Sequence, residues 1–431
     1  MKRKLTTIEY LIDGNLSYRL AIAGELSMER LRAALDRVQG KHPALRMLIR
    51  EERDGLYYEL DAAGPVPLRA ATCMSERDLA REIEREEAIT FAPHEPQLRV
   101  AWLRTDHGGL LLITTAHRIC DGMSLLIVAK ELLGGLHREQ ALLPYAPLSP
   151  LDVAGDAHGP DEWKRRLAAA AINGLIGLVP PSRQPLLRDP VRREWQVDVG
   201  LTAALKHRCR RERVSMHAAL LAVLDQALQA ALGKRAPTRI DSPIDARRGR
   251  LPLLKDDMLF FGGGSFKIAV GCERGADLWE RARDIYREMG EKIEQELQDI
   301  PGKYRFCEML KPPSDDKVRS IVRLGDALSR NGNWNQFSFS NLGPIDLVEP
   351  DAPFRLEEFS LSVRSFGVRI LGLLAFSLHG QLRFVYVGEE QCMSLAEVDA
   401  LERVFMELLR EQVARGERAT ELARVLEPAS E

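Results

Sequence analysis

The sequence predicts a mixed α/β protein (α+β) built as two lobes of similar size with a central cleft or tunnel between them. The chain has 431 residues, which is enough for two domain-sized units with ample core. Segments with strand and helix periodicity alternate in both halves. Prolines cluster between residues 142 and 190, as is typical of a linker. We therefore expect an N-terminal lobe over residues 1–145, a linker over 146–190 and a C-terminal lobe over 191–431.

The first half combines strands, hairpins and amphipathic helices. Leu31, Leu35 and Val38 recur at helical spacing after Ser27, and Asp54-Gly55 is a strong hairpin signal. The expected elements, in chain order, are strand 16–22, helix 27–40, hairpin 45–60, helix 75–88, hairpin 98–117 and helix 123–136. Residues 110–115 are apolar or β-branched throughout, which indicates a strand buried on both faces. Residues 117–121 consequently lie in a tight turn between that strand and the following helix.

The second half repeats this mixture after a short helix expected at about residues 160–175 in the linker. Ser215 is a good N-cap for a long apolar helix that ends near Leu232. The other expected elements are strand 194–199, a helix from about 201, strand 238–244, helix 277–298, strand 336–340, strands 366–378 and 382–387, and helix 394–415. Gly262-Gly263-Gly264 lacks the lysine of a P-loop and the spacing of a dinucleotide fingerprint, so we interpret it as a bend.

Composition excludes several classes of protein. Hydrophobic residues make up 45% and charged residues 29% of the chain, which is ordinary for a soluble globular protein, and the net charge of -2 does not indicate a nucleic-acid binder. We expect no membrane span, and the basic start Met1–Lys4 is not followed by the apolar stretch of a secretory signal. The six cysteines are scattered, so neither a metal site nor a disulfide framework is expected. These features favour a cytoplasmic protein.

One short segment carries candidate chemistry. His117 ends a buried strand at a sharp turn, for which Gly122 supplies the backbone freedom. A histidine held there has an ordinary pKa of about 6.5 and suits general-base catalysis. Asp121 either orients His117 or pairs with an arginine to hold the turn, because a carboxylate in an apolar turn needs a partner. Spacing alone is a weak signal, since His-x-x-x-Asp often arises by chance and a lone histidine is usually structural.

The context of this segment is more specific. Residues 115–124, Thr-Ala-His-Arg-Ile-Cys-Asp-Gly-Met-Ser, resemble the HHxxxDG motif of the superfamily of condensation domains and chloramphenicol acetyltransferase-like acyltransferases. Residues 41–46 resemble the RHxxLR segment of that superfamily, residues 241–247 its strand ending in arginine, and residues 339–344 its SN-x-G turn. The matches follow the superfamily's order over nearly the whole chain. The chain thus resembles a free-standing condensation or polyketide-associated acyltransferase, with two chloramphenicol acetyltransferase-like lobes.

The resemblance implies a role for each matching residue. His117 would be the catalytic base, and Gly122 would leave room for the acyl carbonyl and offer its N–H to the oxyanion. Asp121 would be structural and paired with Arg247, although Arg46 is a second possible partner. Ser340 and Asn341 would bind substrate across the tunnel. Trp334 and Phe337 precede that turn; they line an apolar acyl pocket or belong to the core.

Some residues depart from the pattern or invite other interpretations. Ala116 stands where condensation domains have their first histidine, and the DFGWG motif of plant-type enzymes is absent. Cys120 occupies a variable motif position, which disfavours a covalent cysteine mechanism. The basic run 206–213 is more simply a solvated helix end than a site for a coenzyme A phosphate or an acidic carrier protein. His42 is more readily explained as structural than as catalytic.

The resemblance predicts an acyltransferase of natural-product or lipid biosynthesis. It would move an acyl group from acyl-coenzyme A, or from a phosphopantetheine thioester on an acyl or peptidyl carrier protein, to a hydroxyl or amine of a small molecule. No bound cofactor or metal is expected, because a thioester is already activated. The alternatives are a peptide-type condensation enzyme fed by carrier proteins and a non-catalytic member that binds a carrier protein or scaffolds a complex. We expect a monomer; acyl chain, acceptor and donor carrier stay open.

Overall fold

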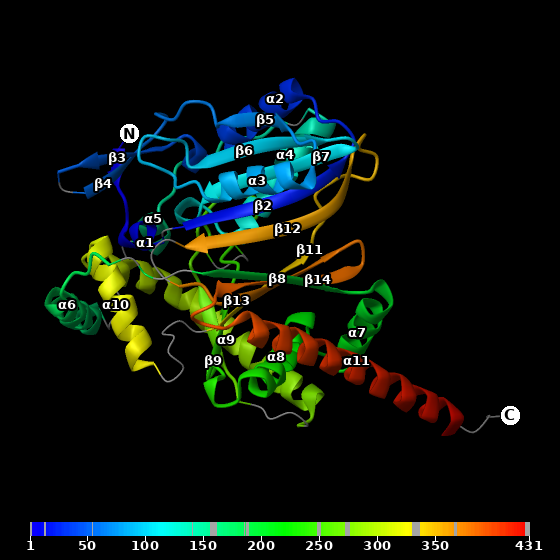
Figure 1. Ribbon diagram of the computed structural model, residues 1–431. Coiled ribbons are helices and arrows are strands. Elements are labelled where there is room, and N and C mark those ends of the chain that lie inside the picture. Colours follow the sequence, from blue (N-terminus) through cyan, green and yellow to red (C-terminus); the bar gives the residue numbers. More distant parts are fainter. Residues whose placement is uncertain are drawn as a thin grey trace.

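Two β-sheets define the two lobes of the protein (Figure 1). The computed structural model describes residues 2–12, 14–53, 55–139, 141–155, 162–184, 186, 189–247, 251–271, 276–329, 337–365 and 369–426. One lobe is formed mainly by the first third of the chain, and the other mainly by residues after 190. The expectation of a mixed α/β fold with two lobes is confirmed.

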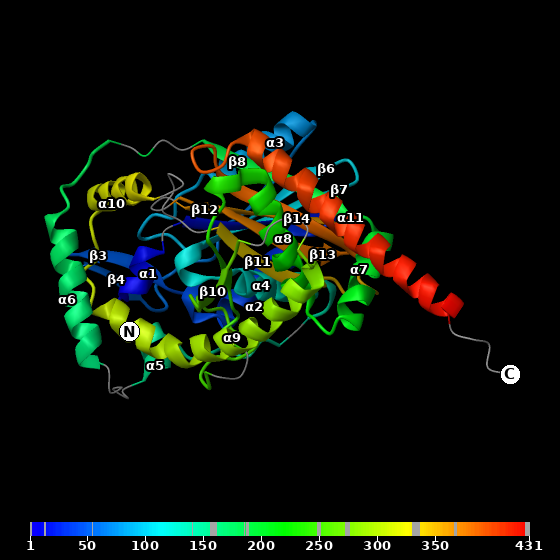
Figure 2. The same cartoon turned by 90° about the horizontal axis from the view of Figure 1, so that it is seen from below.

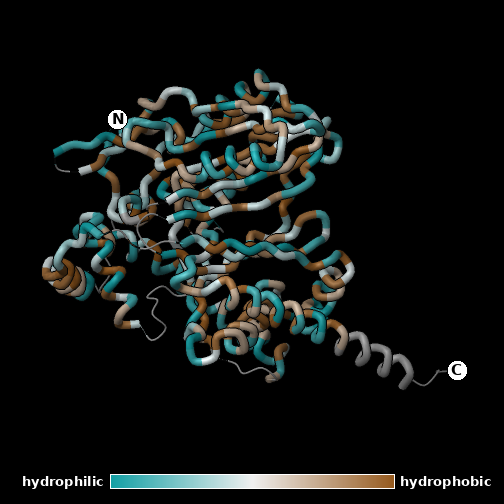
Figure 3. Tube along the Cα trace, in the orientation of Figure 1, coloured by the Kyte–Doolittle hydropathy of each residue, from teal (hydrophilic) through white to brown (hydrophobic). Residues whose placement is uncertain are grey.

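The first lobe contains a five-stranded sheet with the order β12-β2-β7-β6-β5. Its strands are β2 (Gly14–Ala23), β5 (Leu68–Thr72), β6 (Leu98–Thr105), β7 (Gly108–Ala116) and β12 (Arg355–Ser365). Along β6, Leu98, Val100 and Trp102 face one way, towards helices α2 (Met28–Lys41) and α4 (Gly122–His137). Ala101 and Leu103 face the other way, where α3 (Glu76–Glu87) covers the sheet. This alternation buries the central strands on both faces, and Figure 3 shows the mixed hydropathy along them.

The second lobe contains a six-stranded sheet with the order β10-β9-β11-β13-β14-β8. Its strands are β8 (Pro190–Val197), β9 (Arg239–Pro243), β10 (Ser265–Ala269), β11 (Phe337–Pro344), β13 (Gly372–Leu378) and β14 (Gln381–Glu389). Its helices are α7 (Val199–Arg211), α8 (Met216–Leu232), α9 (Leu278–Glu308) and α11 (Leu395–Leu426). Figure 2 shows α8, α9 and α11 on the outer side of this sheet. The other side of the sheet is turned towards the first lobe, so Phe376 and Val385 join the core of that lobe.

Strand β12 belongs to the first sheet although it lies late in the chain. It pairs with β2 in antiparallel register, with Leu361 opposite Tyr18 and Val363 opposite Leu16. The predicted division at residues 145 and 190 stays a prediction, but residues 191–431 are not confined to the second lobe. The physical reason is that β2 would otherwise expose an unpaired edge, which β12 covers with backbone hydrogen bonds.

The remaining elements lie around these two sheets. Near the N-terminus, β1 (Lys2–Lys4), β4 (Gly55–Glu59) and β3 (Leu48–Glu52) form a small antiparallel sheet in that order. The other elements are α1 (Thr7–Leu11), α5 (Pro150–Ala154), α6 (Glu162–Leu178), α10 (Asp315–Leu328), and the short 3-10 helices η1 (Pro43–Leu45), η2 (His117–Ile119) and η3 (Gly233–Arg235). The side chain of Lys317 on α10 donates to the carbonyls of Ile176 and Gly177 at the end of α6, so these two helices are linked.

Several boundaries differ from the sequence prediction. Helix α9 continues to Glu308 through Pro301, whereas we expected it to end at about 298. Residues 315–328, for which no element was predicted, form α10. The strand expected to begin at 366 is β13, which begins at Gly372; residues 366–368 lie outside the described part of the chain. Tertiary packing decides such boundaries more than local propensity does.

One helix meets the length and composition of a membrane span, contrary to our expectation that no segment would. This segment, Met216–Arg235, is 61% buried within the protein. It comprises α8, whose apolar residues pack against the second sheet and helices α9 and α11. A core helix surrounded by other elements is apolar on all sides for the same physical reason as a membrane helix.

Candidate active site

The motif segment forms a turn between β7 and α4, as the sequence predicted. Strand β7 ends at Ala116, η2 follows, and α4 begins at Gly122 with Asp121 as its N-cap. The backbone N–H of Ser124 donates to Asp121 Oδ1 at 2.8 Å, which satisfies one free donor of the first helical turn. The turn therefore places His117 and the N-terminus of α4 at the same edge of the sheet.

His117 has one ring nitrogen occupied by its own turn. Its Nδ1 lies 2.8 Å from the carbonyl oxygen of Cys120. A carbonyl can only accept a hydrogen bond, so Nδ1 carries the proton in the neutral ring and Nε2 keeps its lone pair. The ring of Phe261 packs edge-on against His117, with centroids 5.4 Å apart and planes at 89°. These contacts orient the imidazole and leave Nε2 as its proton acceptor.

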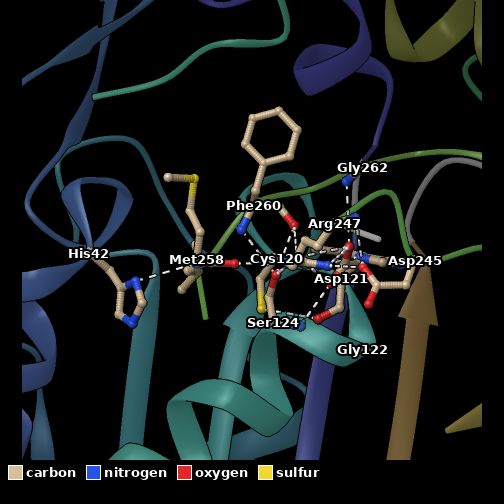
Figure 4. A network of polar contacts seen from close by, with 12 residues as sticks. His42, Cys120, Asp121, Gly122, Ser124, Asp245, Arg247, Met258, Phe260 and Gly262 are labelled. Atoms are coloured by element: carbon tan, nitrogen blue, oxygen red, sulfur yellow. Dashed lines mark hydrogen bonds and ion pairs between the residues drawn. The ribbon is translucent and has the colours of Figure 1, made fainter. Parts of the chain in front are cut away.

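Asp121 pairs with Arg247 in a buried network (Figure 4). The guanidinium, only 2% exposed, donates to both carboxylate oxygens of Asp121 at 3.0 and 3.2 Å and to Asp245 at 2.8 Å. It also donates to the carbonyls of Met258 at 2.8 Å and Phe260 at 2.7 Å. Burial alone would lower the pKa of Arg247, but the two carboxylates raise it above its ordinary value. The charge of Asp121 is thereby neutralised inside the protein.

Two residues that we did not single out from the sequence complete this network. Ser124 is fully buried; its hydroxyl donates to the carbonyl of Phe260 at 2.8 Å and accepts from the N–H of Phe260 at 3.0 Å. The N–H of Gly262 points at Asp121 Oδ2 at 3.4 Å, and a Cβ added at Gly262 would lie 3.0 Å from Ala246 Cβ. Two features of the sequence could have indicated these contacts. One is a serine in an otherwise apolar helix turn, and the other is the glycine run 262–264, which we interpreted only as a bend.

Two neighbouring groups are held in their neutral forms. Burial raises the pKa of the Cys120 thiol well above its ordinary value, so the thiol is a poor nucleophile. Burial also raises the pKa of Tyr18, whose hydroxyl donates to the carbonyl of Gly122 at 2.6 Å. A Cβ added at Gly122 would lie 3.2 Å from Leu342 and 3.4 Å from the Tyr18 hydroxyl, so glycine permits this close packing.

His117, Asp121 and Gly122 line one end of a chamber between the two lobes. The chamber has a volume of about 320 Å³. Its walls come from β2 and β12 of the first sheet, from β9, β10, β11, β13 and β14 of the second, and from Ile244, Phe261, Gly263 and Gly264 in the segment between β9 and β10. Phe261 also lines a separate cavity of about 40 Å³ beside Tyr58 and Arg118. A mostly apolar chamber with a few convergent polar groups is typical of a small-molecule site.

The other predicted site residues lie in three different places. Ser340 lines the chamber, across from the motif. The side-chain oxygen of Asn341 accepts from the N–H of Gly343 at 2.9 Å and so stabilises its own turn. Trp334 lies outside the described residues. Arg46, the alternative partner of Asp121, pairs instead with Asp61. The functional roles of these residues remain predictions.

A metal site is not part of this chamber. Within the described residues, one group has ligand atoms close enough to share a cation: His137, Glu349 and Asp351. None of these three lines the chamber, and Arg138 already pairs with both acids. The chamber itself offers a fixed proton acceptor, the N-terminus of α4 and an apolar interior. This arrangement suits proton transfer from a nucleophile and stabilisation of an oxyanion.

Comparison with known proteins finds a family model that matches part of the chain. Residues 14–147, which contain the motif turn, match the model of the condensation domain. Cyclosporin synthetase simA of Tolypocladium inflatum is 28% identical over 322 residues, 70% of this chain and 2% of that protein. Phosphinothricin tripeptide synthetase PhsC of Streptomyces viridochromogenes is 24% identical over 316 residues, 67% of this chain and 28% of that protein. The chain spans only a small part of the length of these relatives.

Solved structures share the fold over nearly the whole chain. The epimerization domain from the third module of tyrocidine synthetase B superposes with a TM-score of 0.67 at 15% identity, covering 96% of each chain. Polyketide synthase associated protein 5 of Mycobacterium tuberculosis gives 0.65 at 14% identity, covering 95% of this chain and 98% of its own. Trichothecene 15-O-acetyltransferase of Fusarium sporotrichioides gives 0.62 at 12% identity, covering 95% and 94%.

The fold and the motif turn define a two-lobed α/β protein with a chamber between its two large sheets. Residues 14–147 thus match the condensation domain, and the chain shares the fold of these solved structures over nearly its whole length. The resemblance inferred from the sequence is thereby confirmed.

Proposed function

We propose that this protein transfers an acyl group from a thioester, on coenzyme A or a carrier protein, to a hydroxyl or amine in natural-product or lipid biosynthesis. The observation that carries the proposal is the state of His117. Its Nδ1–H is held by the carbonyl of Cys120 at 2.8 Å, and its ring lines the chamber with Nε2 as the acceptor. Members of the superfamily use substrates bound as thioesters, without a further cofactor.

The proposed reaction has two steps at one carbon. His117 Nε2 accepts the proton of the acceptor hydroxyl or amine as its oxygen or nitrogen bonds to the thioester carbonyl carbon. The carbonyl oxygen becomes an oxyanion, for which Gly122 N–H at the start of α4 is the proposed donor. The oxyanion then collapses, the carbon–sulfur bond breaks, and the thiolate leaves with the proton that His117 held. Asp121 and Arg247 maintain the turn and carry no proton.

The test compares the purified protein with His117→Ala. Both are incubated with acyl-coenzyme A and acyl-carrier thioesters plus mixed alcohols and amines, while free thiol and product mass are followed. Loss of a general base predicts a fall in kcat of about a hundredfold, while the lost hydrogen bond to Cys120 should lower the stability by only about 1 kcal/mol. His107→Ala, at an exposed turn outside the chamber, is the matched control and should leave transfer unchanged. Equal transfer by both proteins would remove His117 from the mechanism.

A second candidate is peptide-type condensation with two carrier-bound substrates. It is favoured by the likeness to peptide synthetases over about two thirds of this chain. The same assay separates the two candidates: amide formation only between carrier-bound partners supports the peptide type, and transfer to a free alcohol or amine supports the first proposal. A protein that binds carrier proteins but transfers nothing from any donor would instead be the non-catalytic member.

A further inference from the structure

We propose that the chamber binds an unbranched aliphatic acyl chain of the donor thioester, of about eight to ten carbons, and that Val363 and Val387 at its far end limit the chain length. This inference rests on the proposed function, because it places the carbonyl of that chain at His117. It concerns the same chamber, but its evidence is the composition and layout of the walls, not the motif.

The first wall is an apolar surface built from aliphatic residues and Tyr18. In the antiparallel pair of β2 and β12, Leu361 lies opposite Tyr18 and Val363 lies opposite Leu16. All four residues line the chamber. Residues directly opposite each other on one face of a sheet have adjacent side chains, so the two pairs form one patch. This patch exists only because β12 crosses from the second half of the chain into the first sheet.

The second wall combines small and aliphatic residues. Ser338 pairs with Gly372, Ser340 with Leu374, and Gly372 in turn with Val387, across strands β11, β13 and β14. All of them line the chamber. The small residues Ser338, Ser340 and Gly372 therefore line this wall, and a Cβ added at Gly372 would lie only 3.2 Å from Ser338 Cβ, so glycine permits this close packing.

The order of the strands gives the chamber a direction. In the first sheet, β7 leads to His117, β2 is next to it and β12 is at the edge. In the second sheet, β11 is followed by β13 and then β14. Strand β12 lies against β14. A chain that starts at His117 therefore runs across β2 and β13 and ends between Val363 of β12 and Val387 of β14.

The charge of the walls favours a hydrocarbon over an aminoacyl group. Among the described residues that line the chamber, Asp121 bears the negative charge, and Arg247 already neutralises it at 3.0 Å. An α-ammonium or a side-chain carboxylate placed here would lose its water without gaining an unpaired opposite charge, which is costly. Methylene groups gain free energy in the same place.

The spacing of the strands sets the expected length. Neighbouring strands lie about 4.8 Å apart, so the path from the end of β7 across β2 to β12 is about 10 Å long, which an extended chain of about eight carbons spans. An acetyl group would leave most of this space empty. A chain of sixteen carbons would exceed it unless the far end opened.

The first experiment measures binding in the absence of an acceptor. N-acetylcysteamine thioesters of acetic, butyric, hexanoic, octanoic, decanoic, dodecanoic and palmitic acid, and of alanine, are titrated into the protein in a calorimeter. Affinity should rise about fourfold with each added methylene, up to eight or ten carbons, and then level off or fall. Equal affinity for the alanyl and decanoyl thioesters would overturn the proposal.

The second experiment changes the far end of the chamber. Val387→Phe should weaken binding of the decanoyl thioester at least tenfold and leave the butyryl thioester within about twofold. Val363→Leu is the milder variant, should Val387→Phe fail to fold, and should shift the optimum by one or two carbons. Val199→Phe, at a half-exposed position on α7 outside the chamber, is the matched control.

The outcomes separate this proposal from the proposed function. A uniform loss for all thioesters in Val387→Phe would mean that the chamber holds the thiol arm, and would overturn the chain assignment. If binding affinity depended on chain length for 1-alkanols and not for thioesters, the chamber would hold the acceptor. This result would also overturn the assignment to the donor chain. Chain-dependent binding without transfer to any acceptor would sink the proposed function and leave the chamber as a fatty-chain site. Transfer confined to acetyl or aminoacyl donors would support the proposed function and overturn the assignment of the chamber to a fatty chain.

Discussion

His117 follows a strand and His42 follows a helix. One segment of the second half of the chain, residues 257–262, which we call the crossover segment, contacts both histidines. His42 follows α2 and is fully buried; its Nε2 lies 2.8 Å from Glu131, and its Nδ1 accepts from the N–H of Leu259 at 3.3 Å. His117 follows β7; its Nδ1 is held by the carbonyl of Cys120, and its Nε2 has no hydrogen-bond partner among the described residues. The comparison teaches that a histidine is a candidate base when its surroundings leave a nitrogen free, whatever motif it lies in.

The crossover segment explains how both regions are built. The N–H of Leu259 fixes His42, the carbonyl of Phe260 accepts from Arg247, and the ring of Phe261 packs against His117. Gly263 adopts a φ of 61°, a conformation that favours glycine, where the segment turns towards β10. One stretch of the second half therefore holds a structural histidine on one side and the candidate base on the other.

The largest expected effect comes from breaking the network beside His117. Arg247→Met leaves Asp121 and Asp245 without their buried partner, and should lower the free energy of unfolding by about 3–5 kcal/mol. Urea unfolding measures this loss, and transfer should fall as the turn loosens. Arg46→Ala, which removes the more exposed pair with Asp61, should cost no more than about 1 kcal/mol. Similar losses of unfolding free energy in both variants would contradict the conclusion that Arg247, and not Arg46, holds the turn.

An intermediate effect is expected at His42. Its replacement should lower the stability and leave kcat nearly unchanged, whereas replacement of His117 should mainly lower kcat. His42→Ala removes a buried hydrogen bond to Glu131 and the acceptor of Leu259 N–H, and should cost about 2–3 kcal/mol of stability. At a temperature where the variant is folded, its kcat should stay within about threefold of the original. Thermal unfolding and the transfer assay, run on the same preparation, give both values. A hundredfold loss of kcat with full stability would assign His42 to the chemistry.

The smallest effect is a pH dependence at a third histidine. Burial lowers the pKa of His217 to about 4, and its Nε2 lies 2.9 Å from the hydroxyl of Ser242, which donates to the carbonyl of Phe339. The unfolded chain binds this proton near pH 6.5 and the folded chain only near pH 4. Stability is thus lost as the pH falls between these values, by roughly 1–2 kcal/mol from pH 7 to pH 5.

The measurement is urea unfolding at pH 7 and pH 5 for the original protein and for His217→Gln. The variant should lose less stability on acidification, because it has no imidazole to protonate on unfolding. His207→Gln, at an exposed position of α7, should keep the original pH dependence. An identical pH dependence in His217→Gln would show that the imidazole is equally accessible to protons in both states.

Much of the site was predictable because it is local. The strand, the turn and the helix around residues 116–122 follow from short-range patterns: a β-branched apolar run, a glycine and an apolar helix with Asp121 at its start. Helix α10 was not predicted, although its charged and apolar residues recur at helical spacing. Its last residue, Leu328, is apolar and yet exposed. The role of Ser124 was missed, because its partners lie 123 and 136 residues away.

The sequence by itself predicted the resemblance to the superfamily, the two-lobe α/β fold and the candidate base, since contiguous residues set the conformation of one turn and carry its motif. Only the tertiary structure decided that Arg247 and not Arg46 meets Asp121, that β12 joins the first sheet, and that apolar pairs of the first sheet and small residues of the second line one chamber. These features join residues more than a hundred positions apart. Their pairing depends on which surfaces pack together, and the local propensity of a segment does not determine its distant partner.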